Sequence, residues 1–156
     1  MISPELLRRY PFFGTLDDAQ LKQIAMISEQ VTFKKDDVIL KERDLANTLF
    51  ILLNGSVDLF FHSAGEIHPE HSKELFAGEI NPGEIFGISA LVEPYILSAS
   101  VRAAKDCEVI KIDALALRSL LQQDGKLGCL LMVQIAKTLR IRLDAARVQL
   151  AAAWAD

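Results

Sequence analysis

The sequence lacks any long hydrophobic run and any N-terminal targeting pattern. Its 156 residues contain no stretch that approaches the ~20 uninterrupted apolar residues of a transmembrane helix. The N-terminus, Met-Ile-Ser-Pro-Glu-Leu-Leu-Arg-Arg, has no basic region followed by an apolar region and a small-residue cleavage site, so it does not read as a signal peptide. These absences argue against a membrane protein and predict a cytoplasmic location.

An excess of positive charge is also missing. The formal net charge is −4 at pH 7, the isoelectric point is about 5.4, and no basic face is evident in the sequence. Nucleic-acid phosphates are bound by clustered lysines and arginines. This charge balance therefore argues against nucleic acid as a partner.

Cysteine is scarce, and the two cysteines are isolated. Cys107 and Cys129 form no Cys-x-x-Cys pair, so neither a zinc site nor a redox dithiol is indicated. Buried, reduced thiols are the simpler interpretation.

No catalytic constellation is present. The sequence has no Gly-x-Ser-x-Gly elbow, no P-loop, and no histidine beside a candidate serine or cysteine nucleophile. Its one cluster of potential metal ligands lies in a polar loop where Pro69 prevents the helical spacing that would bring two histidines together. We therefore predict neither an enzyme nor a metal site. The members of that cluster are His62, Glu66, His68, Glu70 and His71.

What the chain does contain is the pattern of one α+β domain. A hydrophobic share of 51% and a charged share of 24% are ordinary for a globular protein of this length. Residues 1–29 are predicted to be helical. One helix covers residues 3–10 and ends before Pro11, and a second helix opens at an apparent capping box, Thr15–Asp18.

Between residues 30 and 112, apolar residues alternate with a period of two, which predicts short antiparallel strands. The Asn54-Gly55 dipeptide tolerates positive φ and is the strongest hairpin signal in the chain, so the strands beside it are expected to pair. Strands this close together favour a β-roll of jelly-roll type. The predicted strands cover residues 31–33, 38–40, 48–53, 56–61, 74–80, 84–86, 98–104 and 107–112.

Residues 113–156 are predicted to form two helices, begun by Asp113 and Asp124 as N-caps. The second helix, over residues 124–153, carries an apolar seam with alternating four- and three-residue steps, as in a coiled coil. Ile135, Ile141 and Val148 widen this stripe toward the helix's own β-roll. We expect a homodimer through this helix, although such a helix can also pack wholly on its own domain. The seam residues are Met132, Ala136, Leu139, Leu143, Ala146 and Leu150.

The stretch Asn81–Ala103 organises the rest of the chain. The Pro82-Gly83 turn and a short strand lead to Gly87, which permits a sharp bend. The residues Ser89–Leu91 suit a single helical turn with unpaired amides. Small residues then line the return path at Ser98–Ser100, where hydroxyls and amides suit a phosphate.

This stretch resembles the phosphate-binding cassette of the cyclic-nucleotide-binding domain family, which includes catabolite activator protein and the regulatory subunits of cAMP-dependent protein kinase. The family cassette reads Phe-Gly-Glu-x-Ala-Leu and then, several residues on, Arg-x-Ala-x-Val-x-Ala. The resemblance implies a β-roll flanked by N-terminal helices and a long C-terminal helix that pairs two subunits and lids the pocket. The matching residues here are Phe86, Gly87, Ala90, Leu91, Ala99, Val101 and Ala103.

Two positions depart from the family pattern. Ile88 stands where a glutamate accepts the ribose 2′-hydroxyl, and Leu97 stands where an arginine pairs with the cyclic phosphate. A hydrogen bond to a charged group is worth roughly 1.5 to 3 kcal/mol, so losing both costs about 3 to 6 kcal/mol, on the order of a hundred- to ten-thousand-fold in affinity. Arg102 is the nearest cation, but strand alternation directs its side chain to the opposite face.

The resemblance implies a non-enzymatic regulatory domain that senses a small ligand or holds a regulatory partner protein. The ligand is expected to be a cyclic nucleotide or another small anion. Two alternatives remain open: a structural homodimer with a vestigial pocket, and a transcription regulator without its helix-turn-helix, since the chain stops at Asp156. The residues expected around the ligand are Phe86, Gly87, Ile88, Ser89, Ala90, Leu91, Leu97, Ser98, Ala99 and Ser100.

Overall fold

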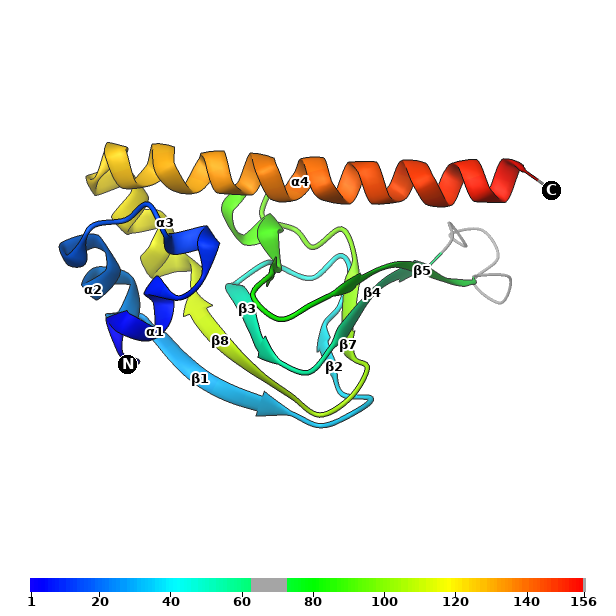
Figure 1. Cartoon of the computed structure of the whole chain (residues 1–156), viewed down its shortest axis with the longest axis horizontal. Coiled ribbons are helices and arrows are strands. Elements are labelled where there is room, and N and C mark those ends of the chain that lie inside the picture. Colours follow the sequence, from blue (N-terminus) through cyan, green and yellow to red (C-terminus); the bar gives the residue numbers. More distant parts are fainter. Residues whose placement is uncertain (63–72, 156) are drawn as a thin grey trace.

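The computed structural model describes residues 1–62 and 73–155, which form a β-roll with helices at both ends of the chain (Figure 1). Two four-stranded antiparallel sheets make the roll, with strand orders β1-β8-β3-β6 and β2-β7-β4-β5. The predicted α+β class and antiparallel roll are confirmed. The strands are β1 (Ser28–Phe33), β2 (Val38–Leu40), β3 (Thr48–Asn54), β4 (Val57–His62), β5 (Glu74–Ile80), β6 (Ile85–Phe86), β7 (Ser100–Ala103) and β8 (Cys107–Asp113).

Strand β3 is buried on both faces and joins the two apolar cores. Leu49 and Ile51 belong to a core that includes the helices, whereas Phe50 and Leu52 belong to a core between the two sheets. A strand covered on both faces reads as a continuous apolar run instead of an alternating one. This explains why residues 49–53 are all apolar.

The Asn54-Gly55 turn passes from one sheet to the other, so the predicted pairing of its flanking strands is wrong. Strand β3 pairs with β8 and β6, whereas β4 pairs with β7 and β5. The dipeptide still meets a local requirement, because Gly55 has a φ of 99°. The turn residues set the bend, while packing of the whole roll selects the partners of each strand.

Replacing Gly55 with alanine is expected to lower the free energy of unfolding by at least about 2 kcal/mol. An added Cβ would lie 2.6 Å from the Asp106 carbonyl oxygen and 2.6 Å from the Cys107 Cβ, at a positive φ that strains alanine. Gly125→Ala is the matched control, because no heavy atom lies within 4 Å of its added Cβ and it opens a helix. Urea unfolding compares the two variants, and equal stabilities would contradict this account of the turn.

The N-terminal segment contains α1 (Pro4–Arg8), the 3-10 turn η1 (Pro11–Phe13) and α2 (Asp18–Met26). The predicted capping box at Thr15–Asp18 is wrong, because the box begins at Asp17. The Asp17 carboxylate accepts from the Gln20 amide at 2.8 Å, and the Gln20 side chain accepts from the Asp17 amide at 3.0 Å. Glutamine has the reach that this reciprocal pair needs, whereas Asp18 would have been one methylene too short.

The C-terminal segment consists of α3 (Ala114–Gln123) and α4 (Gly125–Trp154). Both predicted N-caps are confirmed, since Asp113 accepts from the Ala116 amide at 2.8 Å and Asp124 accepts from the Leu127 amide at 3.0 Å. The Gln20 side chain of α2 also donates to Asp124, at 3.3 Å. The bond from Leu127, followed by the bond from Gln20, holds the pKa of Asp124 below its usual value.

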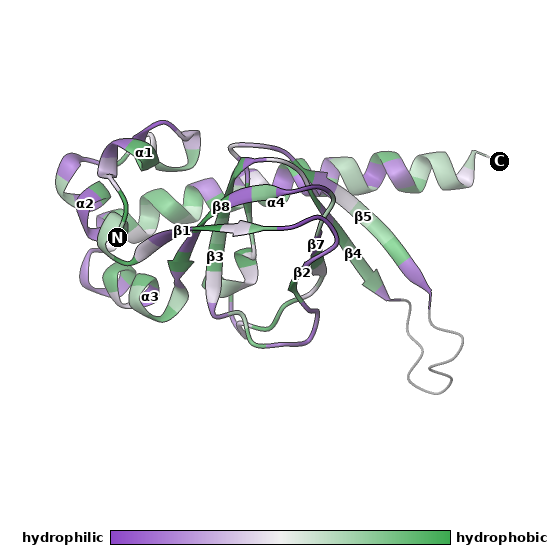
Figure 2. Ribbon diagram, turned by 90° about the horizontal axis from the view of Figure 1, so that it is seen from below, coloured by the Kyte–Doolittle hydropathy of each residue, from purple (hydrophilic) through white to green (hydrophobic). Residues whose placement is uncertain are grey.

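Helix α4 runs along the length of the molecule, and its last turns reach past β2 and β7 (Figure 1). Its first half packs on the body through the buried Leu127, Leu131 and Ile135. Ile141 and Val148 are 65% and 70% exposed, so the prediction that they pack on the helix's own roll is wrong. Apolar and polar residues alternate along the exposed part (Figure 2), which leaves an uncovered apolar surface.

Within residues 1–62 and 73–155, no helix combines the length and apolar character needed to cross a bilayer. Four members of the loop cluster lie outside the described residues: Glu66, His68, Glu70 and His71.

Candidate functional site

The sharp bend predicted after β6 is present. Gly87 has a φ of 75°, and the single 3-10 turn η3 (Ile88–Leu91) follows it. Glycine is needed here because an added Cβ would lie 2.9 Å from the Thr48 carbonyl oxygen. The Ala90 amide donates to the Gly87 carbonyl oxygen at 3.0 Å. This turn amide is therefore used within the protein and is not offered to a ligand.

A cavity of about 230 Å³ lies between η3, the return segment 97–99 and α4. Four strands contribute apolar or small side chains to its wall, namely Leu40, Leu59, Ala77 and Val101. Six of the ten residues predicted to surround a ligand line this cavity, and they come from both ends of the cassette. These six are Gly87, Ile88, Ser89, Leu97, Ser98 and Ala99.

The other four predicted residues lie behind the cavity wall. Phe86 is fully buried and stacks on Phe50, with ring centroids 4.8 Å apart. Ala90 and Leu91 are buried in the core shared with the helices. Ser100 is buried as well, and its hydroxyl accepts from the Glu42 amide at 2.9 Å. These residues shape the cassette from inside the fold.

The two positions that depart from the family pattern both face the cavity. Ile88 is half-buried, and Leu97 is 5% exposed. The backbone of Leu97 is fixed, because its amide donates to the Asp44 carbonyl oxygen at 2.9 Å and its carbonyl accepts from the Arg43 amide at 2.8 Å. A side chain at position 97 is thus held at the cavity wall, and here it offers neither a donor nor an acceptor.

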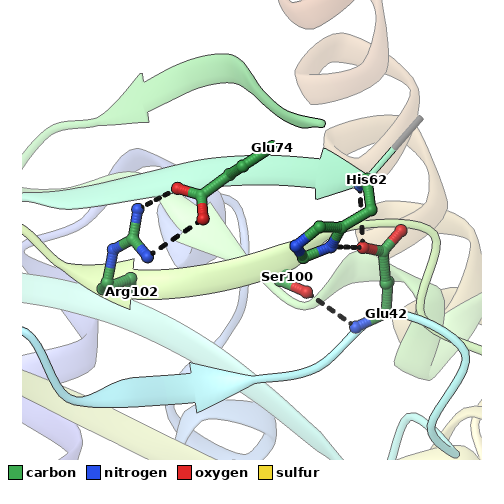
Figure 3. Close-up of polar contacts among 5 residues, drawn as sticks. All are labelled: Glu42, His62, Glu74, Ser100 and Arg102. Atoms are coloured by element: carbon green, nitrogen blue, oxygen red, sulfur yellow. Dashed lines mark hydrogen bonds and ion pairs between the residues drawn. The ribbon is translucent and has the colours of Figure 1, made fainter. Parts of the chain in front are cut away.

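Arg102 does not line the cavity, as strand alternation predicts. Its guanidinium pairs with the Glu74 carboxylate (Figure 3). It also lies 4.4 Å from the centre of the Phe60 ring. The hydrogen bond from Arg102 is the main reason that the pKa of Glu74 lies below its usual value. Arg102 therefore links β7 to β5 across the intervening strand β4, and its side chain does not line the cavity.

A second set of polar contacts lies at one end of the strands of the same sheet (Figure 3). The Glu42 carboxylate accepts from the His62 amide at 2.9 Å and lies 2.6 Å from His62 Nδ1. Because the Glu42 amide also donates to Ser100, this residue joins the segment after β2 to the end of β4 and the start of β7. These contacts hold three strands that frame the cavity.

Helix α4 supplies two cavity residues that sequence reasoning did not place there, Leu139 and Arg142. Arg142 is half-buried, and its guanidinium donates to the Ile85 carbonyl oxygen. Burial lowers the pKa of this guanidinium, with the Glu84 charge acting in the opposite direction. The predicted seam includes Leu139, but no local signal marks Arg142, because only the fold brings α4 over the cassette.

Comparisons with known proteins agree with this geometry. The model of the cyclic nucleotide-binding domain family matches residues 30–124, which include the roll and the cassette. The chain belongs to this family. The predicted family is therefore confirmed.

Solved structures with the same fold come from several bacteria. A cyclic nucleotide-binding protein from Geobacter metallireducens GS-15 is 40% identical with a TM-score of 0.80, and the match covers 92% of this chain and 99% of that one. The N-terminal domain of a transcriptional regulator from Streptomyces coelicolor A3(2) is 26% identical with a TM-score of 0.67, over 90% and 94% of the two chains.

A curated relative is the cAMP-activated global transcriptional regulator Vfr of Pseudomonas aeruginosa. It is 34% identical over 106 residues, which are 65% of this chain and 47% of Vfr. The cyclic nucleotide-binding domain described here thus spans about half the length of that relative.

Arg118 of α3 fixes the cassette of this cyclic nucleotide-binding domain from behind. Its Nε donates to the Ala90 carbonyl oxygen at 2.7 Å, and its Nη2 donates to the Ala46 carbonyl oxygen at 2.8 Å. The guanidinium also lies 3.8 Å from the centre of the Tyr95 ring. One arginine therefore ties η3 to two neighbouring loops. The only hint in the sequence is that Arg118 is the single charged residue of α3.

Replacing Arg118 with glutamine is expected to lower the free energy of unfolding by roughly 1.5 to 3 kcal/mol, because two carbonyl oxygens lose a charged donor. Amide hydrogen exchange should also increase in η3. Lys126→Gln on α4 removes an exposed positive charge without such contacts and serves as the control. If η3 exchanged at the same rate in both variants, Arg118 would not be what holds the turn.

Proposed function

We propose that this domain is a non-enzymatic sensor of a small ligand, and that the ligand is neither cAMP nor cGMP. The observation that carries the proposal is the composition of the cavity wall. The wall combines the family cassette with two residues of α4, Leu139 and Arg142. A ligand in this cavity would contact α4 directly, and it would shift the position of α4 if it bound one position better than another.

The side chains at positions 88 and 97 support the exclusion of ordinary cyclic nucleotides. The family resemblance assigns a glutamate and an arginine to these positions, and the chain has Ile88 and Leu97. Arg102 cannot replace the missing arginine, since it pairs with Glu74 away from the cavity. A cyclic phosphate at Leu97 would lose the charged hydrogen bonds that the arginine supplies, at a cost of roughly 1.5 to 3 kcal/mol for each contact.

The open cavity favours a sensor over a structural dimer with a vestigial pocket. In a vestigial pocket, Ile88 and Leu97 would fill the space that the ligand has left. Here the two side chains line a cavity of about 230 Å³ without filling it. The cavity therefore leaves room for a ligand beside these two side chains.

We also propose that α4 pairs two copies of the chain. The seam residues Leu139, Leu143 and Leu150 are all exposed on the single chain, as is Trp154 near the end of the helix. A continuous apolar stripe of this kind usually marks an interaction surface. The coiled-coil spacing of the seam fits a second copy of the same helix.

Thermal melting against cAMP, cGMP and a panel of small metabolites tests the sensor function. A specific ligand at ~100 times its dissociation constant adds about 2.7 kcal/mol to the folded state, which gives a shift of several degrees. We expect such a shift for at least one metabolite and none for cAMP or cGMP. The shift should vanish in Ala99→Phe, which adds a ring to the cavity wall. No shift with any compound would count against the proposal.

A transcription regulator with a further DNA-binding domain is a second candidate. It is favoured by the match to Vfr, of which the matching region is only 47%. Reading the gene beyond the codon for Asp156 decides this point, because a helix-turn-helix coded downstream would establish the regulator.

A further inference from the structure

The guanidinium of Arg142 is a partly buried positive charge. It reaches the cavity from α4, and it also borders a second cavity of about 510 Å³ between η1, the Gly83–Ile85 turn and α4. Within the described residues, its guanidinium donates to the Ile85 carbonyl oxygen. A guanidinium has five N–H donors, so this contact uses only part of its capacity.

Among residues 1–62 and 73–155, no carboxylate lies within ion-pair distance of Arg142. The acid that acts on it is Glu84, whose carboxylate instead accepts from the Asn81 amide at 3.0 Å. An arginine stays charged at any physiological pH. A cation that is partly removed from water and has no counter-ion is costly, and an anion beside it would recover part of that cost.

Most of the remaining cavity wall is apolar, and the other side chains in it that can hydrogen-bond are the hydroxyls of Ser89 and Ser98. Leu40, Leu59, Leu97 and Val101 come from three strands and the return segment, and they present no hydrogen-bonding group to the cavity. The wall therefore suits a molecule with an apolar body and one charged end.

We propose that the cavity binds a small amphipathic anion, with its carboxylate, phosphate or sulfonate oxygens on Arg142 and its apolar body against the leucines of the roll. This inference rests on the sensor function proposed above and names the class of its ligand. The anion-binding group is then on α4 instead of on the return segment, where Leu97 stands. Ligand binding would directly join α4 to the roll.

A matched pair of dyes tests the inference. The probe 8-anilinonaphthalene-1-sulfonate carries one sulfonate, and N-phenyl-1-naphthylamine has the same rings without it. Fluorescence titrations should show tighter binding of the sulfonate dye to the wild-type protein. Arg142→Gln should lower the affinity for the sulfonate dye by about tenfold or more and leave the affinity for the neutral dye little changed. Arg142→Lys should restore part of the preference.

Two controls locate the effect. Arg140→Gln removes an exposed charge from the same helix that does not line the cavity, and it should keep the preference for the sulfonate dye. Ala99→Phe should lower the affinity for both dyes, and this result would show that they occupy the cavity. Circular dichroism melting verifies that each variant is folded.

Each outcome decides the inference. Equal affinity of the wild-type protein for the two dyes, or a preference that survives in Arg142→Gln, overturns the role of Arg142 while the cavity and the sensor function stand. Binding that Ala99→Phe leaves unchanged, or no binding of either dye, overturns the amphipathic ligand altogether. The metabolite panel then remains as the separate test of the sensor function.

Discussion

The double variant Ile88→Glu with Leu97→Arg is expected to bind cAMP at least about a hundredfold more tightly than the wild-type protein. The two substitutions restore the family's ribose and phosphate contacts at positions that already line the cavity. The backbone at Leu97 is held by hydrogen bonds to Asp44 and Arg43, so a new arginine would start from a fixed point. Isothermal titration calorimetry measures the gain.

A matched control separates this gain from a general effect of charge. Val92→Arg with Ile96→Glu introduces the same two side chains at exposed positions of the same segment, and it should not bind cAMP. Each cavity substitution alone should gain less than the pair, because an unpartnered charge in the cavity is penalised. A folded double variant without cAMP affinity would mean that the cavity has lost the family shape as well as its polar contacts.

The double variant Leu143→Asp with Leu150→Asp is expected to convert a dimer into a monomer. Each aspartate replaces an exposed leucine of the seam, and a dimer would have to bury four carboxylates without partners. The dissociation constant should rise by about a hundredfold or more. Analytical ultracentrifugation of wild-type and variant proteins at equal concentration measures the change in mass.

Val148→Asp with Ala152→Asp is the control for the seam. It adds the same two carboxylates to exposed positions of α4 outside the seam, so the protein should remain a dimer. Dimers of both double variants would place the interface elsewhere on the molecule. A monomeric wild-type protein would remove the interface altogether.

Local signals in the sequence predict most of the elements. The period of two predicts the strands of the roll, and β5 begins and ends at the predicted residues Glu74 and Ile80. The bend at Gly87 and the single turn after it are also as predicted. These features depend on a few neighbouring residues, whose backbone preferences and hydrogen bonds are readable without the fold.

Features set by distant parts of the chain could not be read in this way. The Asn54-Gly55 turn looks like a hairpin, but β3 pairs with β6 and β8, which follow much later in the chain, and β4 pairs with β5 and β7. Arg118 and Arg142 reach the cassette from two helices that the fold places against it. An isolated arginine in a helix carries no signal of what it will touch, so the sequence alone predicted the cassette but missed the residues that hold and close it.

The central claim is that the pocket of a cyclic nucleotide-binding domain persists here with apolar side chains at Ile88 and Leu97. Calorimetric titration of the purified wild-type protein with cAMP tests it most directly. The account predicts no saturable binding at concentrations that saturate the double variant Ile88→Glu with Leu97→Arg. Tight, saturable binding of cAMP by the wild-type protein would contradict it.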